Sequence, residues 1–215
     1  MPGNPDGDKS YSGRLCAGFH FLSPFPVFCW HNISGNVMMI KKIKFTDERG
    51  IFMEFRAKTV AESKVETVHI IRPADLNDAG RLFGGVLMQW IDEVAALVAK
   101  RHSQMNVTTA SVDNLRFLQG AFQRDVIVII GRVTHVGNTS MEVKVEPYVE
   151  HTDGKRDLIN RAFLTEIGLG EDNKPATLPR LILETEEDRK EWERAEMRRN
   201  LRAKQRKEGF HFYGE

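Results

Sequence analysis

Asp92 is the residue of this sequence that most needs a chemical explanation. It lies in a segment, from Gly85 to about His102, in which almost every residue is apolar or small. Such a segment predicts a helix that is buried on most sides, and a carboxylate within it costs free energy unless it is used or paired. A partly buried carboxylate is a stronger general base for activating water. The alternative is an aspartate that is hydrogen-bonded to a neighbouring strand, and both interpretations stay open.

The turn before this helix carries a second group of candidates. Gly84 and Gly85 would let a ligand approach the helix N-terminus, where unpaired N–H groups carry partial positive charge. Such donors suit an oxyanion, as in the tetrahedral intermediate of thioester hydrolysis. A tight strand-to-helix turn explains the glycines more simply. The amide of Asn77 could donate to a carbonyl or orient a water, although asparagine is also favoured in turns.

The face of the helix that carries Asp92 is lined mainly by small residues. Asp92 follows Gly85 by seven residues, close to two helical turns, and the same face includes Met88, Ala96 and Ala99. A substrate or a second copy of the helix can therefore approach the carboxylate closely.

Strand-like patterns surround the helix. Before it, Val65, Thr67, His69 and Ile71 alternate with their neighbours, and Pro73 ends the run. After it come four strand-like runs, joined by glycine-containing turns, at residues 107–118, 126–136, 140–150 and 156–167. We expect these runs to form an antiparallel meander.

The run at residues 140–150 alternates apolar side chains with glutamate and lysine, which predicts one buried and one solvated face. Pro147 indicates a bulge or a sheet edge there. One long buried helix followed by antiparallel strands predicts an α+β fold. A single hotdog domain, in which a curved antiparallel sheet wraps around one long helix, fits this order.

The two ends of the chain differ from its middle. Residues 1–52 have scattered glycine, proline and aromatic residues and no sustained period, so we expect a disordered or non-native N-terminal extension. One hypothesis is that Met53 is the natural start. The hotdog domain is expected at residues 57–170, and a tail with a charged C-terminal helix at residues 171–215.

The charged helix is expected to begin near Thr185, which forms a capping-box pattern with Asp188. Its acidic residues come early and its basic residues late, which matches the helix dipole. The basic end could contact phosphate or RNA. Pairs such as Glu186 with Lys190 also fit an ordinary solvated helix, which we favour.

Composition excludes several classes of function. The formal net charge is +1, so no global field would hold the chain on nucleic acid or on a membrane. Both cysteines, Cys16 and Cys29, precede the expected domain, which therefore needs no disulfide or thiol nucleophile. The seven histidines are dispersed, so we expect no metal site and no cofactor. The apolar run at residues 86–99 is too short to span a bilayer.

Four separated motifs in order resemble the hotdog-fold acyl-CoA thioesterases, in particular the YciA-like and cytosolic long-chain acyl-CoA hydrolase group. The resemblance covers about residues 60–170. The motifs are Asn77-x-x-Gly80-x-x-Phe83-Gly84-Gly85, Met88-x-x-x-Asp92, the run from Val107 to Asp113 that leads into Phe117-Leu118, and the run from Gly137 to Val143.

The resemblance implies a cytoplasmic enzyme that hydrolyses acyl-CoA to a free carboxylic acid and CoA. Asp92 would act as general base or nucleophile. Asn77 and the backbone N–H of Gly84 or Gly85 would engage the thioester carbonyl and water. The site would lie between two subunits, so the chain would form at least a homodimer and, as relatives often do, a trimer of dimers.

Contacts with the CoA moiety are less well marked. Asn138 stands where the family often has a basic residue, and Gln119-Gly120 stands where a basic residue and proline are common. The candidates are Arg116, Asn138, Thr139 and Ser140, with Arg132 and Lys144 as further basic residues for which ordinary surface charge is the alternative.

Two other functions remain as alternatives. A non-catalytic acyl-CoA sensor would keep the pocket but lose the carboxylate, and it would usually bring a DNA-binding domain; Asp92 is present, and no helix-turn-helix pattern is recognisable in residues 1–52. A hotdog hydratase or dehydratase would need a placed acid/base histidine. His69, His102 and His135 show no such placement in the sequence.

Overall fold

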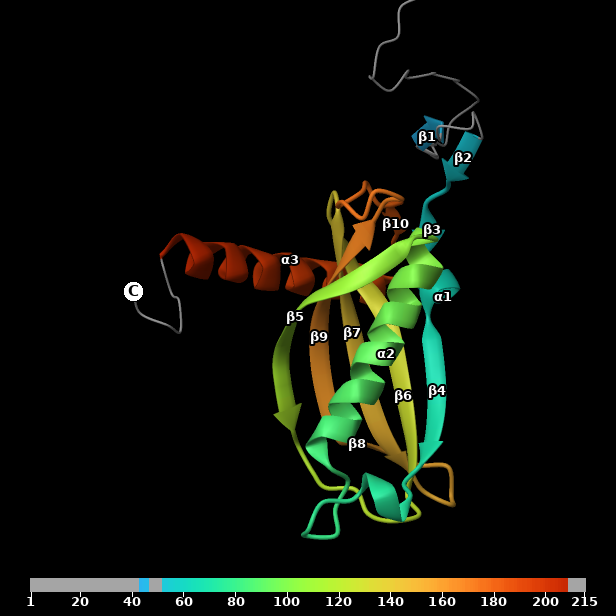
Figure 1. Ribbon diagram of the computed structural model, residues 1–215, viewed down its shortest axis with the longest axis vertical. Coiled ribbons are helices and arrows are strands. Elements are labelled where there is room, and N and C mark those ends of the chain that lie inside the picture. The colour runs from blue at the N-terminus through green and yellow to red at the C-terminus, as the bar shows by residue number, and fades with distance from the viewer. Residues whose placement is uncertain (1–42, 47–51, 209–215) are drawn as a thin grey trace, which may run out of the picture. The chain divides into compact units, whose positions relative to one another are not determined.

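A computed structural model describes residues 43–46 and 52–208 of the protein (Figure 1). The expectation for residues 1–52 therefore falls largely outside the described residues, as do both cysteines. Near the N-terminal limit of the described residues, two short strands pair in a way that the sequence pattern did not indicate. Strand β1 (Ile43–Thr46) pairs antiparallel with β2 (Phe52–Phe55).

A six-stranded antiparallel sheet wraps around one long helix, α2 (Gly84–Ser103). The strands are β4 (Val65–Ile70), β5 (Asn106–Phe117), β6 (Val126–Val136), β7 (Ser140–Glu150), β8 (Arg156–Leu158) and β9 (Asn160–Leu169). The sheet order is β4-β6-β7-β9-β5, and β8 pairs with β7. Figure 1 shows α2 lying across the curved sheet. This arrangement confirms the predicted α+β hotdog fold.

The expected meander is wrong for β5. That strand pairs with β9, at the edge of the sheet opposite β4, whereas β6 pairs with β4. Because the chain crosses the sheet along α2 before β5 begins, β5 reaches the far edge, and the sheet can curve around the helix between its two edges. The run at 156–167 also divides into two strands at Ile159.

The outer face of β7 is covered, although the sequence predicted a solvated face. Glu142, Lys144 and Glu146 are only 3%, 5% and 4% exposed. Helix α3 (Glu186–Lys207) packs over the first two: Arg198 pairs with Glu142 at 2.8 Å, and Lys144 Nζ lies 3.0 Å from Glu191 Oε2. Glu146 pairs with Arg132 and Arg161 of the neighbouring strands. An alternating pattern of charged residues fits ion pairing with a helix as well as it fits contact with water.

Helix α3 begins as predicted. Thr185 Oγ1 accepts from the N–H of Asp188 at 3.1 Å, and Asp188 Oδ2 accepts from the N–H of Thr185 at 3.0 Å. Further along α3, Trp192 packs on His135 with ring centroids 4.2 Å apart. The helix is therefore half packed against the sheet rather than fully solvated.

Pro147 marks neither a bulge of β7 nor a sheet edge. It lies opposite Ile129 of β6 on one side, and on the other side its carbonyl accepts from the N–H of Ile159 at 3.0 Å. Ile159 separates β8 from β9, so the irregularity is in the neighbouring strand.

The C-terminal end of α2 is anchored by three small elements: β3 (Lys58–Thr59), α1 (Val60–Ser63) and β10 (Leu181–Ile182), which pairs with β3. The 3-10 turn η1 (Pro73–Asp75) lies at the N-terminal end, where the Asp75 carbonyl accepts from the N–H of Phe83. His102 of α2 is fully buried there. Its ring lies 2.9 Å from Ser63 Oγ and 3.1 Å from the carbonyl oxygen of Pro179. Burial lowers the pKa of His102 to about 4, so the ring is neutral at pH 7.

His102 should make stability depend on pH. Its pKa is about 4 when folded and 6.5 when unfolded, so the unfolded chain binds more protons between these values and stability is lost as pH falls through this range. We expect the difference in unfolding free energy between wild type and His102→Gln to shrink by about 3 kcal/mol from pH 7 to pH 4. Urea unfolding at fixed protein concentration measures it. A difference that is constant with pH would contradict the prediction.

Candidate active site

Asp92 lies on the outer side of α2. The opposite side of the helix is buried against the sheet. Gly131 of β6 lets Val94 of α2 pack closely on the sheet, because a Cβ at residue 131 would lie only 2.7 Å from Val94 Cγ1. Asp92 and Met88 are exposed in the single chain, whereas Ala99 is buried toward the sheet. The expectation of a helix buried on most sides is therefore wrong for one chain, because the sheet covers only one side of α2.

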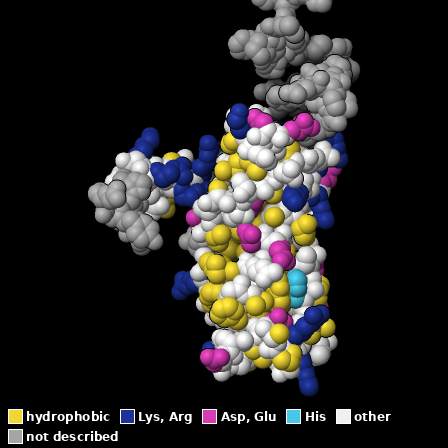
Figure 2. Space-filling model, in the orientation of Figure 1, with side chains coloured by type: hydrophobic (Ala, Val, Ile, Leu, Met, Phe, Trp, Pro, Cys, Tyr) yellow, Lys and Arg dark blue, Asp and Glu magenta, His cyan; other side chains and the backbone are white. Residues whose placement is uncertain are grey.

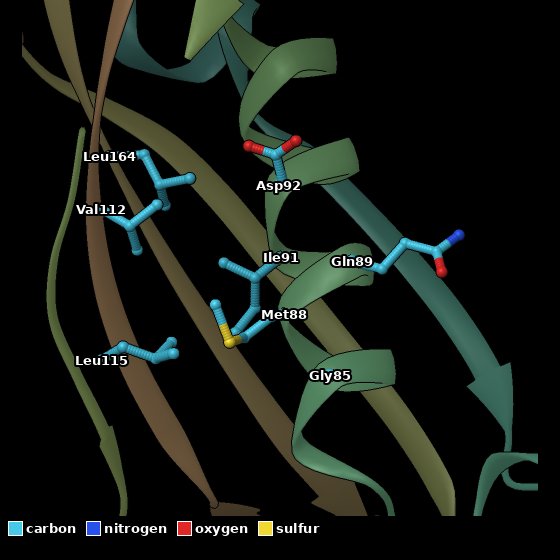
Figure 3. Close-up of a pocket in the computed structure, with 8 residues that line it drawn as sticks. All are labelled: Gly85, Met88, Gln89, Ile91, Asp92, Val112, Leu115 and Leu164. Atoms are coloured by element: carbon cyan, nitrogen blue, oxygen red, sulfur yellow. The ribbon is translucent and has the colours of Figure 1, made fainter. Parts of the chain in front are cut away.

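A pocket of about 310 Å³ opens between α2 and the strands β5 and β9. Its lining is Gly85, Met88, Gln89, Ile91 and Asp92 from α2, Val112 and Leu115 from β5, and Leu164 from β9. Figure 3 shows the apolar side chains facing one another across the gap, with Asp92 above them and Gln89 on the other side of the helix. A carboxylate beside an otherwise apolar pocket fits an acyl group with a reactive carbonyl.

The carboxylate of Asp92 belongs to a short hydrogen-bonded chain. Thr109 Oγ1 of β5 lies 2.7 Å from Asp92 Oδ1 and 3.1 Å from Glu166 Oε1 of β9. The sequence motifs included Thr109 without assigning it a role, and Glu166 was missed. The alternation of β9 could have indicated Glu166, because Ala162, Leu164 and Glu166 are spaced two residues apart and lie on the same buried face of the strand.

Glu166 is fully buried. Desolvation raises its pKa to about 7, the hydrogen bond to Thr109 lowers it, and the charge of Asp92 raises it. Its second oxygen, Oε2, is buried with no hydrogen-bond partner among the described residues. A neutral acid fits this environment better than a carboxylate does.

Asn77 shapes the turn before α2. Its Oδ1 accepts from the N–H of Ala79 at 3.0 Å and from the N–H of Arg81 at 3.1 Å. Because both partners are N–H donors, the atom they meet is the oxygen, and the Nδ2 amide is directed away from the turn. Asn77 is exposed, so this amide can donate to a ligand. Gly80, with a φ of 69°, allows the tight turn.

The N-terminus of α2 has free donors. Its N-cap, Phe83, makes no side-chain capping bond, and the first helical bond runs from the N–H of Leu87 to the Phe83 carbonyl. The N–H groups of Gly84 and Gly85 therefore have no partner within the helix. A Cβ at Gly84 would lie 3.1 Å from Phe117 Cζ, so the glycine also makes room for β5.

One chain does not bring these groups together on one carbonyl. Asp92 follows Gly85 by seven helical residues, which places it about 10 Å further along the axis. A reacting carbonyl needs its oxyanion donors and its base within about 3 Å. The N-terminal donors and the carboxylate therefore lie too far apart to act on the same carbonyl.

The surface around the pocket is unusually apolar for an exposed face. Phe83, Phe117, Met88 and Val112 are 54%, 51%, 44% and 42% exposed. Figure 2 shows hydrophobic side chains gathered over this face, with acidic side chains among them. Contiguous apolar surface of this kind marks an interaction site.

The candidates for CoA contact are scattered in one chain. Ser140 lies opposite Ile167 of β9, and Arg116 lies opposite Arg161 of the same strand. Ile167 and Arg161 are six residues apart, so Ser140 and Arg116 are separated by roughly 20 Å along β9. Asn138 and Thr139 lie in the β6–β7 turn, and Ser140 begins β7.

Two basic candidates serve the fold instead. Lys144 is buried and pairs with Glu146 and Glu191, and Arg132 pairs with Glu146 at 3.0 Å. The suggested role in nucleotide contact is wrong for Lys144, because α3 covers it. Arg132 is engaged in the same cluster of ion pairs.

No group of three or more potential metal ligands occurs among residues 43–46 and 52–208. Within these residues, no helix is both long and apolar enough to cross a bilayer.

Comparison with known proteins identifies the family of the chain. The model of the thioesterase superfamily matches residues 79–154. The chain is 41% identical over 128 residues to the uncharacterised acyl-CoA thioester hydrolase YkhA of Bacillus subtilis, covering 59% of this chain and 74% of that protein. It is 37% identical over 155 residues to the cytosolic acyl coenzyme A thioester hydrolase of Rattus norvegicus, covering 70% of this chain and 40% of the rat protein.

Solved structures show the same fold. An acyl-CoA hydrolase of Staphylococcus aureus, in complex with butyryl coenzyme A, coenzyme A and coenzyme A disulfide, is 32% identical with a TM-score of 0.68, covering 71% of this chain and 94% of that one. Alanine variants of its aspartate, asparagine and threonine residues have also been solved. A hexameric acyl-CoA thioesterase in its apo form is 36% identical with a TM-score of 0.67, covering 69% and 97%.

The chain belongs to the hotdog-fold acyl-CoA thioesterases of the thioesterase superfamily. Its activity is the hydrolysis of acyl-CoA thioesters, and its relatives are bacterial acyl-CoA hydrolases and mammalian cytosolic acyl-CoA thioester hydrolases.

Proposed function

We propose that this protein hydrolyses acyl-CoA at a site built by two subunits, in which Asp92 of one chain faces Asn77 and the Gly84-Gly85 donors of the other. The separation of about 10 Å between Gly85 and Asp92 along α2 carries this proposal, because it prevents one chain from completing the site. The exposed apolar surface around the pocket gives the second subunit a place to bind.

The reaction needs a base and an oxyanion site. The Asp92 carboxylate takes a proton from water as the water oxygen attacks the thioester carbonyl carbon. Charge moves to the carbonyl oxygen, where Asn77 and the N–H of Gly84 or Gly85 donate. The C–S bond then breaks as the CoA thiolate takes the proton held by Asp92, which leaves the free acid, CoA and the Asp92 carboxylate. In the alternative, Asp92 attacks the carbonyl itself and expels the CoA thiolate, which takes up a proton from solvent, and water then hydrolyses the resulting anhydride.

The alanine variants of the Staphylococcus aureus hydrolase support these residues. The positions of its replaced asparagine, aspartate and threonine are 15 and 17 residues apart. These are the spacings from Asn77 to Asp92 and from Asp92 to Thr109 in this chain. We therefore add Thr109 to the proposed site.

Assembly and location follow from the same relatives. We propose a homodimer as the active unit and a trimer of dimers as the complete assembly, and the hexameric state of one relative supports an assembly of six chains. The cytosolic relatives support a cytoplasmic location. Residues 57–170 would form the hotdog unit, residues 1–52 an extension, and residues 171–215 a tail whose helix α3 packs on the sheet.

The CoA moiety would extend from the pocket over residues of more than one subunit. Arg116 and the residues between β6 and the start of β7, Asn138, Thr139 and Ser140, are the proposed contacts. Because they lie roughly 20 Å apart within one chain, we propose that different subunits supply them to one ligand.

Release of free CoA thiol from a panel of acyl-CoA esters, from short to long and aromatic, tests the function. Hydrolysis with a clear rank among the esters is the expected result. Tight binding of acyl-CoA without turnover would favour a sensor. Conversion of an enoyl-CoA to its hydrated thioester, with no thiol released, would favour a hydratase.

A further inference from the structure

Glu166 is a buried acid that the hydrolytic mechanism above does not use. It lies on β9 directly opposite Thr109 of β5, and its side chain reaches the threonine hydroxyl. The register of β5 shifts between Thr109 and Ser111, immediately after this pair. Bulges next to active sites re-aim side chains, so the irregularity suits a hydroxyl that must reach Asp92.

The number of available hydrogens decides which group donates in the hydrogen bonds that link Glu166, Thr109 and Asp92. Thr109 has one hydroxyl hydrogen, and its Oγ1 lies within hydrogen-bond distance of Asp92 and of Glu166. Two carboxylates would compete for that single hydrogen. If Glu166 is protonated, it donates to Thr109, and Thr109 donates to Asp92, so every contact is satisfied.

We propose that Glu166, as a neutral acid, is a positioning residue that holds the Thr109 hydroxyl hydrogen on Asp92 and so keeps the carboxylate oriented for catalysis. This inference rests on the proposed role of Asp92. Ionisation of Glu166 would turn the hydroxyl away from Asp92 and place a second negative charge beside it.

The surroundings of Glu166 support its neutral form. Helix α2 contributes Asp92, β5 contributes Thr109, and the cross-strand neighbour on β7 is the apolar Met141. Among the described residues no cation pairs with Glu166, and its Oε2 has no partner. Because the pKa of Glu166 is about 7, a pH range from 5.5 to 9 covers both of its protonation states.

The kinetic test compares Glu166→Gln and Glu166→Leu with wild type from pH 5.5 to 9. For wild type we expect kcat to fall about fivefold as pH rises through about 7, with KM little changed. Glu166→Gln, whose amide still donates to Thr109, should keep the acidic-side kcat and lose this fall. Glu166→Leu should have a kcat about fivefold lower at every pH. An unchanged alkaline fall in Glu166→Gln would overturn the inference.

Two controls separate positioning from folding. His151 is an exposed histidine whose pKa is raised by its hydrogen bond to Asp157, which makes it a control for titration outside the Thr109–Glu166 contact. His151→Gln should retain the wild-type profile. The double variant Thr109→Val with Glu166→Leu should have the same kcat as Thr109→Val alone, because Glu166 acts through Thr109. Additive losses would contradict that route.

A measurement without turnover distinguishes this inference from the proposed function. The infrared difference spectrum of wild type minus Glu166→Gln at pH 6 should contain the band of a neutral carboxylic acid. Its absence would overturn the inference whatever Asp92→Asn does. If the band is present but Asp92→Asn keeps full activity, the proposed function fails while Glu166 is still shown to be protonated.

Discussion

Asp92→Asn should lower kcat for acyl-CoA hydrolysis by about 10²- to 10⁴-fold, because an amide can neither accept a proton from water nor attack the thioester. KM should change far less, since the apolar pocket and the CoA contacts remain. The asparagine still accepts from the Thr109 hydroxyl, so the site keeps its shape. Free thiol release at matched oligomeric state measures the loss.

Glu93→Gln provides the matched control for this variant. Glu93 is the next carboxylate on α2, it is exposed, and it accepts from Gln89 Nε2 at 2.8 Å. Removing its charge should leave kcat within about twofold of wild type. Comparable losses in the two variants would mean that charge on α2, rather than the Asp92 carboxylate itself, supports the reaction.

Glu142→Ala should cost about 3 kcal/mol of stability. Glu142 is almost fully buried beneath α3, where it pairs with Arg198 at 2.8 Å and with Arg202 at 3.2 Å, and it also accepts from Thr134 Oγ1 at 2.7 Å. Its removal leaves two largely buried guanidinium groups short of an acceptor. Denaturant unfolding at fixed protein concentration measures the change.

A partly exposed pair on the same strand gives the comparison. Glu150 of β7 pairs with Arg156 at 2.6 Å, and both side chains are about a third exposed. Glu150→Ala should therefore cost less than about 1 kcal/mol. If Glu142→Ala cost no more than Glu150→Ala, the buried ion pairs of Glu142 would contribute no more to stability than a partly exposed pair does.

The fold could be predicted from the sequence where the signal is local. The bounds of β6 and β7 and the capping of α3 by Thr185 follow from alternation and from short-range hydrogen bonds, and the structure confirms them. The pairing of β5 with β9 could not be predicted, because alternation states which face is buried but not which strand lies beside it. Burial of Lys144 was missed for a related reason, since its partner Glu191 is 47 residues away.

The site divides in the same way. Asp92 could be found as a carboxylate in an apolar helix, and Asn77 and Gly84 as turn residues before it. The contact of Thr109 with Glu166 joins residues 57 positions apart and depends on the register of two strands. The sequence predicted a helix buried on most sides, but Asp92 is exposed in one chain. The apolar pattern of a helix does not distinguish burial against its own sheet from burial against the proposed second subunit.

A subunit-complementation assay tests the composite site most directly. Asp92→Asn and Asn77→Ala chains, each nearly inactive alone, are co-expressed and purified as mixed oligomers. A site built from Asp92 of one chain and Asn77 of the other leaves one intact site in every mixed dimer, so random pairing should restore about a quarter of wild-type activity. Asp92→Asn mixed with the double variant should restore none. Activity no greater than that of the separate variants would contradict a site shared between subunits.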